Sequence, residues 1–283
     1  MLWLILWIIW TFFEELNNSL LKEKSKKYHY VTVWVIMSSF SVIVFLLMWF
    51  YKIYAWNLEL YFSIASIPLL MLRLFLEITQ SYITLIAIKH CDRSTFSILR
   101  VLTIPLLVIA DILLWYQFTH YSLVWIGIIL LSFIFFNINT KTINWKWWYF
   151  ALFTAINAVI TLSLFKYSMT HYWNSVEIDQ GLMALWTVIF FIWFNYKKEK
   201  KLWFYLLKKE KIFWIQWILM ALTSLLLSYS YVYLNASEAT AVKRAWEMFW
   251  SVLAWFLFFQ EKHLLKKILF AICIIIGLII MAL

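Results

Sequence analysis

Apolar residues form long runs along this chain, and polar residues gather in short clusters between those runs. Breaking the sequence at these clusters leaves ten apolar segments, each near the roughly 20 residues that a helix needs to cross a bilayer. The segments are 2–21, 31–51, 60–80, 94–116, 121–138, 147–165, 178–196, 212–232, 239–259 and 264–283. A transmembrane β-barrel would instead show strands of about ten residues with alternating polarity. The pattern therefore predicts an all-α polytopic membrane protein with ten transmembrane helices.

Composition agrees with this class. Hydrophobic residues make up 65% of the chain and charged residues 13%, whereas soluble domains average roughly 45–50% and 25%. An ordinary cytosolic enzyme and a disordered chain are thereby excluded. Neither the two cysteines nor the five histidines show a spacing typical of a metal site, so we expect no metal and no cofactor.

Basic residues lie mainly on one side of the predicted spans. Of the 24 Lys and Arg residues, 18 fall in odd-numbered connections, and the even-numbered connections hold only Lys52 and Lys166. Because basic loops stay on the cytoplasmic side, this predicts cytoplasmic odd-numbered loops in a bacterial inner (plasma) membrane. The net charge of +10 then reflects topology, and no nucleic-acid partner is expected. The lysine-rich connection 197–211 is either a solvated loop or a segment that binds anionic lipid.

Shifting the chain against itself by 144 residues superposes five predicted spans on the other five without a gap. The residues that then match include Trp3 with Trp147, Ser19 with Ser163, Lys22 with Lys166, Trp49 with Trp193, Thr79 with Thr223, and Arg100 with Arg244. The agreement indicates either a duplicated unit or chance identity within an apolar alphabet. The duplication predicts repeats at 1–139 and 145–283 joined by a linker at 140–144. Since each repeat has an odd number of spans, the two would be inverted in the membrane.

The C-terminal part carries a resemblance to a known family. Phe258-Phe259-Gln260-Glu261-Lys262, followed by an apolar segment with Gly277, is similar to the end of EamA-type proteins of the drug/metabolite transporter (DMT) superfamily. The resemblance implies a ten-helix carrier built from two inverted five-helix EamA-like units. The aligned position in the first half is Gln117 rather than an acid, so the first-half motif is degenerate. The family commonly has cytoplasmic termini, whereas the lysine and arginine count places both termini outside.

Several ionisable residues fall inside the predicted spans, where a charge is costly unless it is paired or faces water. Glu14 and Asn18 share one helix face at i, i+4, and we expect that face to line a cavity unless Glu14 lies at the interface. Arg100 and Arg244 occupy equivalent repeat positions and would hold an anionic group bidentately. The alternative is that both arginines extend to the headgroups. These four residues and Glu247 are the predicted substrate-binding set.

Two further i, i+4 pairs have the spacing of a helical ion pair. They are Arg73 with Glu77, and Lys243 with Glu247. Structural pairing is the favoured interpretation of the first. Asp111 stands among apolar residues and is expected to face a partner or water.

These features favour a secondary transporter that moves a small polar metabolite, of amino acid, nucleoside or sugar-phosphate type, by alternating access. No phosphate-binding loop or catalytic motif is present, so gradient-driven export or exchange is expected rather than enzyme activity. The alternatives are a membrane-embedded lipid-modifying enzyme and a non-transporting membrane scaffold. The expected partners are the solute and the lipid bilayer, and a second copy of the chain, forming a homodimer, is a further candidate partner.

The chain has 20 tryptophans and only 3 glycines, whereas average usage of about 7% glycine would give roughly twenty glycines. Membrane helices rely on small residues for close packing. We therefore hypothesise that the gene is decoded with UGA as glycine, so that many of these tryptophans are glycine in the cell. Trp3 and Trp7 would then form a Gly-x-x-x-Gly motif.

Overall fold

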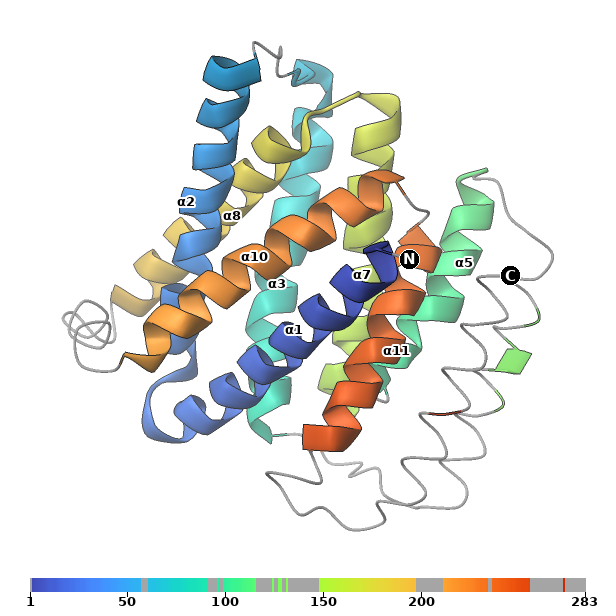
Figure 1. Ribbon diagram of the computed structural model, residues 1–283. Helices are drawn as coiled ribbons and strands as arrows, with labels where there is room; N and C mark the ends of the chain where they lie inside the picture. Colours follow the sequence, from blue (N-terminus) through green and yellow to red (C-terminus); the bar gives the residue numbers. More distant parts are fainter. Residues whose placement is uncertain are drawn as a thin grey trace. The chain divides into compact units, whose positions relative to one another are not determined.

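The computed structural model of the protein is all-helical over the part of the chain that it describes (Figure 1). The described residues are 2–56, 61–90, 96, 99–115, 124, 127–128, 131, 148–196, 211–233, 236–254 and 272. The helices are α1 (Leu2–Lys27), α2 (Tyr30–Trp56), α3 (Ile67–His90), α5 (Thr103–Leu113), α7 (Trp148–His171), α8 (Val176–Tyr196), α10 (Ile212–Tyr233) and α11 (Ala236–Ala254), with a short 3₁₀ turn η1 (Ile64–Ser66). No strand occurs among these residues, which confirms the all-α prediction for them.

Four of the described helices are long and apolar enough to cross a membrane. They cover Val31–Tyr54, Ile64–Ile88, Trp148–His171 and Val176–Asn195. A fifth apolar stretch, Phe213–Tyr229, is shorter. The protein is therefore a helical membrane protein by the length and composition of these segments. Most of the predicted spans 121–138 and 264–283, the connection 197–211 and the motif around Glu261 lie outside the described residues.

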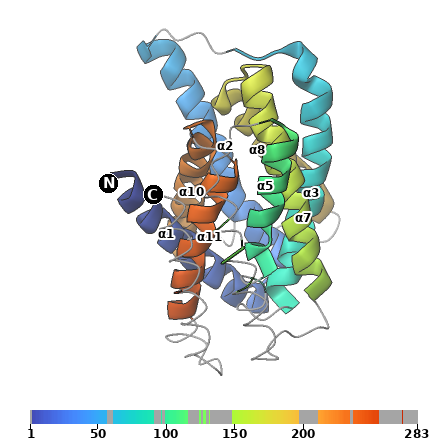
Figure 2. The same cartoon turned by 90° about the vertical axis from the view of Figure 1, so that its right-hand side faces the viewer.

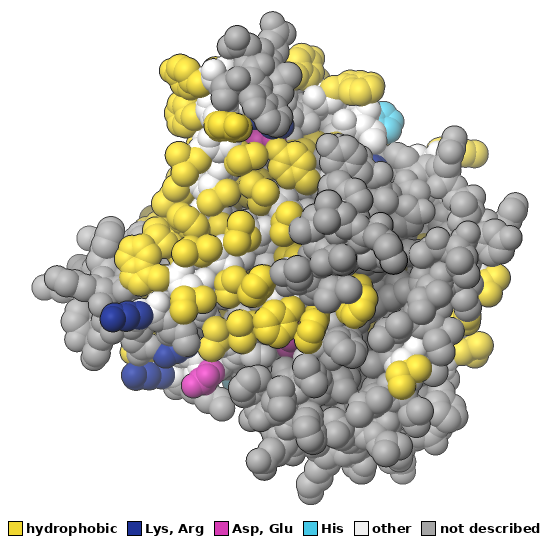
Figure 3. Space-filling model, in the orientation of Figure 1, with side chains coloured by type: hydrophobic (Ala, Val, Ile, Leu, Met, Phe, Trp, Pro, Cys, Tyr) yellow, Lys and Arg dark blue, Asp and Glu magenta, His cyan; other side chains and the backbone are white. Residues whose placement is uncertain are grey.

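α10 exposes several large apolar side chains and buries a polar one. Trp214, Ile215, Ile218 and Leu222 are exposed on it, whereas Gln216 is fully buried on its inner face. Water would penalise such an apolar surface, but lipid tails do not. Figure 3 shows the same character over a wider area, where apolar side chains cover the visible face of α2 and α10. The exposed faces of these helices thus suit contact with lipid.

Helix boundaries differ from the sequence prediction at two places. α1 continues to Lys27 instead of ending near residue 21, because its polar residues include no glycine or proline to stop it. The fourth predicted span is interrupted at Leu102, after which α5 begins at Thr103. Pro105 in the first turn of α5 has no N–H to donate to the carbonyl of Val101, so a continuous helix would lose a hydrogen bond there.

The chain divides into two compact units, each built from segments that are far apart in sequence. The first unit comprises 1–15, 86–163 and 234–283, and the second comprises 16–85 and 164–233. Within the first unit α11 packs on α5, and both helices appear side by side in Figure 2. Within the second unit α2 packs on both α8 and α10. The Asn195 amide donates to Thr32 at 2.8 Å, and the Ser41 and Ser224 hydroxyls lie 3.3 Å apart.

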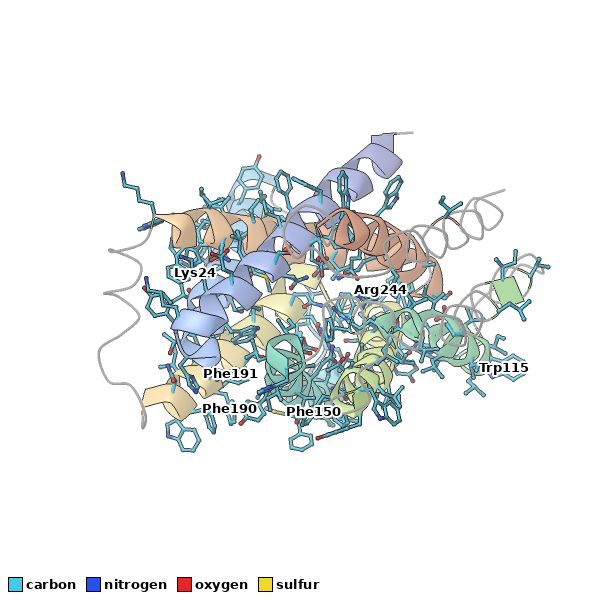
Figure 4. The ribbon with its side chains drawn as sticks, turned by 90° about the horizontal axis from the view of Figure 1, so that it is seen from below. Lys24, Trp115, Phe150, Phe190, Phe191 and Arg244 are labelled. Atoms are coloured by element: carbon cyan, nitrogen blue, oxygen red, sulfur yellow. The ribbon has the colours of Figure 1, made fainter. Side chains whose placement is uncertain are left out.

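Two residues outside the helices have a left-handed backbone, and both are tryptophans. Trp115 has φ 58° and follows α5, and Trp173 has φ 55° and follows α7. In Figure 4 Trp115 lies at the end of α5. No other non-glycine residue among those described has a positive φ.

Candidate functional site

The first unit contains a charged cluster that joins α1 to α11. We define the charged cluster as Glu14, Lys243, Arg244 and Glu247. Lys243 Nζ lies 2.9 Å from Glu14 Oε1 and 3.5 Å from Glu247 Oε1. The Arg244 guanidinium also donates to Glu247 Oε2. One lysine thus connects carboxylates from two helices, and the second carboxylate is shared with an arginine.

Local helix geometry creates half of this arrangement. Residues three and four apart on a helix are neighbours on its surface, so Lys243 and Arg244 both reach Glu247 from the preceding turn of α11. The predicted Lys243–Glu247 pair is confirmed. Figure 4 shows Arg244 on α11. The contact with Glu14 has a different origin, because it requires α1 to pack beside α11.

Three residues of the charged cluster are buried, and the fourth, Glu14, has a side chain that is 18% exposed. The exposed fraction is 5% for Lys243, 3% for Arg244 and 8% for Glu247. Charges removed from water cost several kcal/mol each unless pairing and hydrogen bonds compensate for the loss. Compensation here is incomplete, because Glu14 Oε2 and Arg244 Nε have no hydrogen-bond partner among the described residues. The first of these atoms accepts hydrogen bonds and the second donates them, so together they can bind groups of opposite polarity.

Arg100 belongs to the same unit and precedes α5. Its guanidinium carbon lies 5.3 Å from the centre of the Phe96 ring, a cation–π distance. Arg100 thus lies in the same compact unit as Glu14, Arg244 and Glu247 of the predicted binding set.

Asn18 lies one turn beyond Glu14 on α1, but none of the described ion pairs of the charged cluster includes it. Sequence reasoning also gave Lys243 only a pairing role on its own helix, whereas its closest carboxylate is that of Glu14. The signal that could have identified Lys243 as a member of the charged cluster was its position in the middle of a predicted apolar segment.

The second unit holds its own buried polar network. The Arg73 guanidinium donates to Asp179, and its carbon lies 4.6 Å from the centre of the Phe165 ring. Asn174 donates to Ser168 at 2.9 Å and to Ser66 at 2.8 Å. Ser168 lies 3.4 Å from Asp179 Oδ1. These contacts connect α3, α7 and α8, which indicates a structural role.

This network corrects one sequence interpretation. The helical spacing suggested that Arg73 pairs with Glu77, but the ion pair that Arg73 makes is with Asp179 of α8. Asp179 is buried in the first turn of α8, where the helix dipole favours a negative charge. The helix dipole and the ion pair with Arg73 both stabilise the Asp179 carboxylate. Asp179 is therefore a better partner for Arg73 than Glu77, which lies one turn along the same helix as the arginine.

Two other acidic residues have defined partners. Asp111, expected to face a partner or water, accepts a 3.0 Å hydrogen bond from the Ser237 N–H in the first turn of α11. Glu177, which sequence reasoning missed, lies 2.5 Å from Lys52 Nζ and accepts a hydrogen bond from the Tyr229 hydroxyl. Within the described ranges, no three His, Cys, Asp or Glu side chains gather as metal ligands would.

No family model matches this chain, and no curated protein does either.

Proposed function

We propose that the protein is a secondary transporter that moves a small polar metabolite across the membrane by alternating access. The observation that carries this proposal is the charged cluster. Ionisable groups at membrane depth are rare, and they mark solute or ion pathways more often than stable packing. In this protein such groups join α1 to α11, with a donor and an acceptor that no described residue satisfies.

The helix boundaries favour a duplicated architecture. Shifted by 144 residues, α1 would cover 146–171, and α7 covers Trp148–His171. The same shift moves α2 to 174–200 and α3 to 211–234, where α8 covers Val176–Tyr196 and α10 covers Ile212–Tyr233. Three successive helices thus agree with their counterparts to within four residues at either end. Chance identity of apolar residues would not by itself align the helix ends, because those ends also depend on helix-breaking residues and polar clusters.

The division into compact units points the same way. The unit boundaries after residues 15 and 85, shifted by 144, fall after 159 and 229, and the observed boundaries fall after 163 and 233. Each unit therefore draws corresponding stretches from both halves of the sequence. Glu14 and Arg100 come from the first half, and Lys243, Arg244 and Glu247 come from the second. Inverted repeats with a polar site built by both halves are the usual design of secondary transporters.

The charged cluster supplies chemistry for a solute with an anionic group. A carboxylate or phosphate can accept from Arg244, whose Nε has no described partner, with Arg100 adding a second positive charge. Glu14 Oε2 can accept an amine hydrogen or a proton. Lys243 contacts the carboxylates of both Glu14 and Glu247. A solute group that binds one of these carboxylates therefore leaves the lysine paired with the other. We propose that this exchange of partners lets the buried site load and empty without an isolated charge.

Ligand-dependent thermal stability of the purified protein tests the proposal. Amino acids, nucleosides and sugar phosphates are added separately, and the unfolding temperature is recorded. A solute present at 100 times its Kd should stabilise the folded state by about 2.7 kcal/mol. Arg244→Gln should abolish the shift, and Arg244→Lys should reduce it because the bidentate geometry is lost.

The matched control is Arg73→Lys, which alters an equally buried arginine in the structural network. It should lower the unfolding temperature without removing the solute-dependent shift. Equal loss of the shift in the Arg73 and Arg244 variants, or a shift that survives Arg244→Gln, would argue against a solute site at the charged cluster.

A further inference from the structure

We infer that positions 115 and 173 are glycine in the protein made by its own cells, because UGA codons there are decoded as glycine. The excess of tryptophan over glycine in the sequence raised this possibility for the tryptophans as a group. The backbone now identifies two individual positions.

The backbone at these positions is of a kind that tryptophan disfavours. For a residue with a Cβ, the left-handed region brings that atom too close to the following carbonyl oxygen. Asn, Asp and His enter the region most often among non-glycine residues, and for a bulky residue a positive φ is a genuine outlier. Trp115 and Trp173 nevertheless have φ 58° and 55°. Tryptophan supplies 20 of the 283 residues, so its appearance at both positions is a rare coincidence.

The position within the fold is the one where helices most often use glycine. Many helices end with a left-handed residue just past the C-cap, usually glycine, whose N–H bonds to a carbonyl in the last turn. α5 ends at Leu113 with Leu114 as its C-cap, and the Trp115 N–H then donates to the Ile112 carbonyl at 3.1 Å. This is the i to i−3 bond of a Schellman-type helix end.

α7 also ends two residues before a left-handed tryptophan. Its last helical residue is His171, and the Tyr172 N–H still donates to the Ser168 carbonyl at 3.2 Å. Trp173 follows with its left-handed backbone, and α8 starts at Val176. A left-handed residue, usually glycine, is a common way to end a helix before such a short connection. The adjoining Asn174 is held by Ser66 and Ser168, so the turn is fixed on its other side.

The environment gives the indoles no compensating role. The exposed fraction is 93% for Trp115 and 78% for Trp173. Neither ring has a described hydrogen bond or aromatic partner that would offset an unfavourable backbone. The described glycines, Gly127 and Gly181, in contrast have no positive φ. The left-handed positions thus carry tryptophan although glycine is the residue that suits them.

Peptide mass spectrometry of the protein purified from its own cells tests the inference. Peptides that cover positions 115 and 173 are sequenced, and the codons are read from the gene. The inference expects UGA at both codons and a fragment mass step of a glycine residue at both positions. UGG at these codons, or a tryptophan mass step at either position, overturns it.

A second measurement uses protein made in a host that inserts tryptophan. Trp115→Gly and Trp173→Gly should each raise the unfolding temperature, since the backbone strain is relieved. Trp193→Gly is the matched control, because Trp193 is also exposed but lies inside α8, and this change should not raise the unfolding temperature. A fall in unfolding temperature for both Trp115→Gly and Trp173→Gly would contradict the structural argument.

Discussion

Replacing Lys243 by methionine removes the one positive charge that contacts both Glu14 and Glu247. The Lys243 side chain is 7% exposed, and its ion pair with Glu14 measures 2.9 Å. Removing one partner of a buried pair typically costs about 3–5 kcal/mol, because the remaining charge is left uncompensated. Glu247 keeps Arg244 as a partner, so the uncompensated charge is that of Glu14. We expect Lys243→Met to lower the free energy of unfolding by roughly 3 kcal/mol.

A double-mutant cycle isolates this pair. Glu14→Gln alone should cost less than Lys243→Met, because Lys243 still contacts Glu247 at 3.5 Å. The double variant, with Lys243→Met and Glu14→Gln together, leaves neither residue as a charge without its partner. Its loss of unfolding free energy should therefore be smaller than the sum of the two single losses, by about 1–3 kcal/mol. Reversible denaturation in mixed micelles, followed by circular dichroism, measures all four proteins. Additivity within about 0.5 kcal/mol would refute the reasoning.

The second unit supplies the control for this cycle. Lys52 also pairs with a glutamate, Glu177, at 2.5 Å, and the Glu177 side chain is 1% exposed. Unlike Glu14, Glu177 keeps a second described partner when the lysine is lost, because the Tyr229 hydroxyl donates to it. Lys52→Met should therefore cost less than Lys243→Met, and an equal cost would show that this second partner does not offset the loss of the lysine.

Further substitutions also have defined expected outcomes. Asp179→Asn should cost about 3 kcal/mol in unfolding free energy because it breaks a buried ion pair, and Glu77→Gln should cost less since the arginine of α3 is paired elsewhere; denaturation curves compare the two. Asp111→Ala should lose about 1–3 kcal/mol, because the first turn of α11 no longer has the acceptor of its N–H hydrogen bond, and unchanged stability would contradict that role. Trp173→Gly should gain about 1 kcal/mol in tryptophan-containing protein, measured against Trp193→Gly, which should lose stability.

Sequence patterns predicted the elements better than their contacts. Long apolar runs determine helices because the backbone of a membrane segment must satisfy its own hydrogen bonds, and α2, α3, α7 and α8 follow from them. Pairs on one helix follow from helical spacing, as for Lys243 and Glu247. That spacing misled at Arg73, because Asp179 at the start of another helix is the better partner.

Contacts across helices depend on packing that no local pattern encodes. The 2.9 Å contact of Glu14 with Lys243 joins residues from opposite ends of the chain, and nothing in the spacing of either segment selects that pairing. The left-handed backbone at Trp115 and Trp173 was equally inaccessible, since the letter tryptophan argues against such a conformation. Composition raised the glycine hypothesis, and helix geometry was needed to locate it.

Solute exchange in proteoliposomes tests the central claim most directly. Vesicles loaded with the solute that stabilises the protein are diluted into a trace amount of labelled solute, and its uptake is followed over time. We predict rapid exchange with the unaltered protein, exchange near that rate with Lys52→Met, and none with Arg244→Gln. Absence of exchange by the unaltered protein for every stabilising solute, or undiminished exchange by Arg244→Gln, would contradict the account.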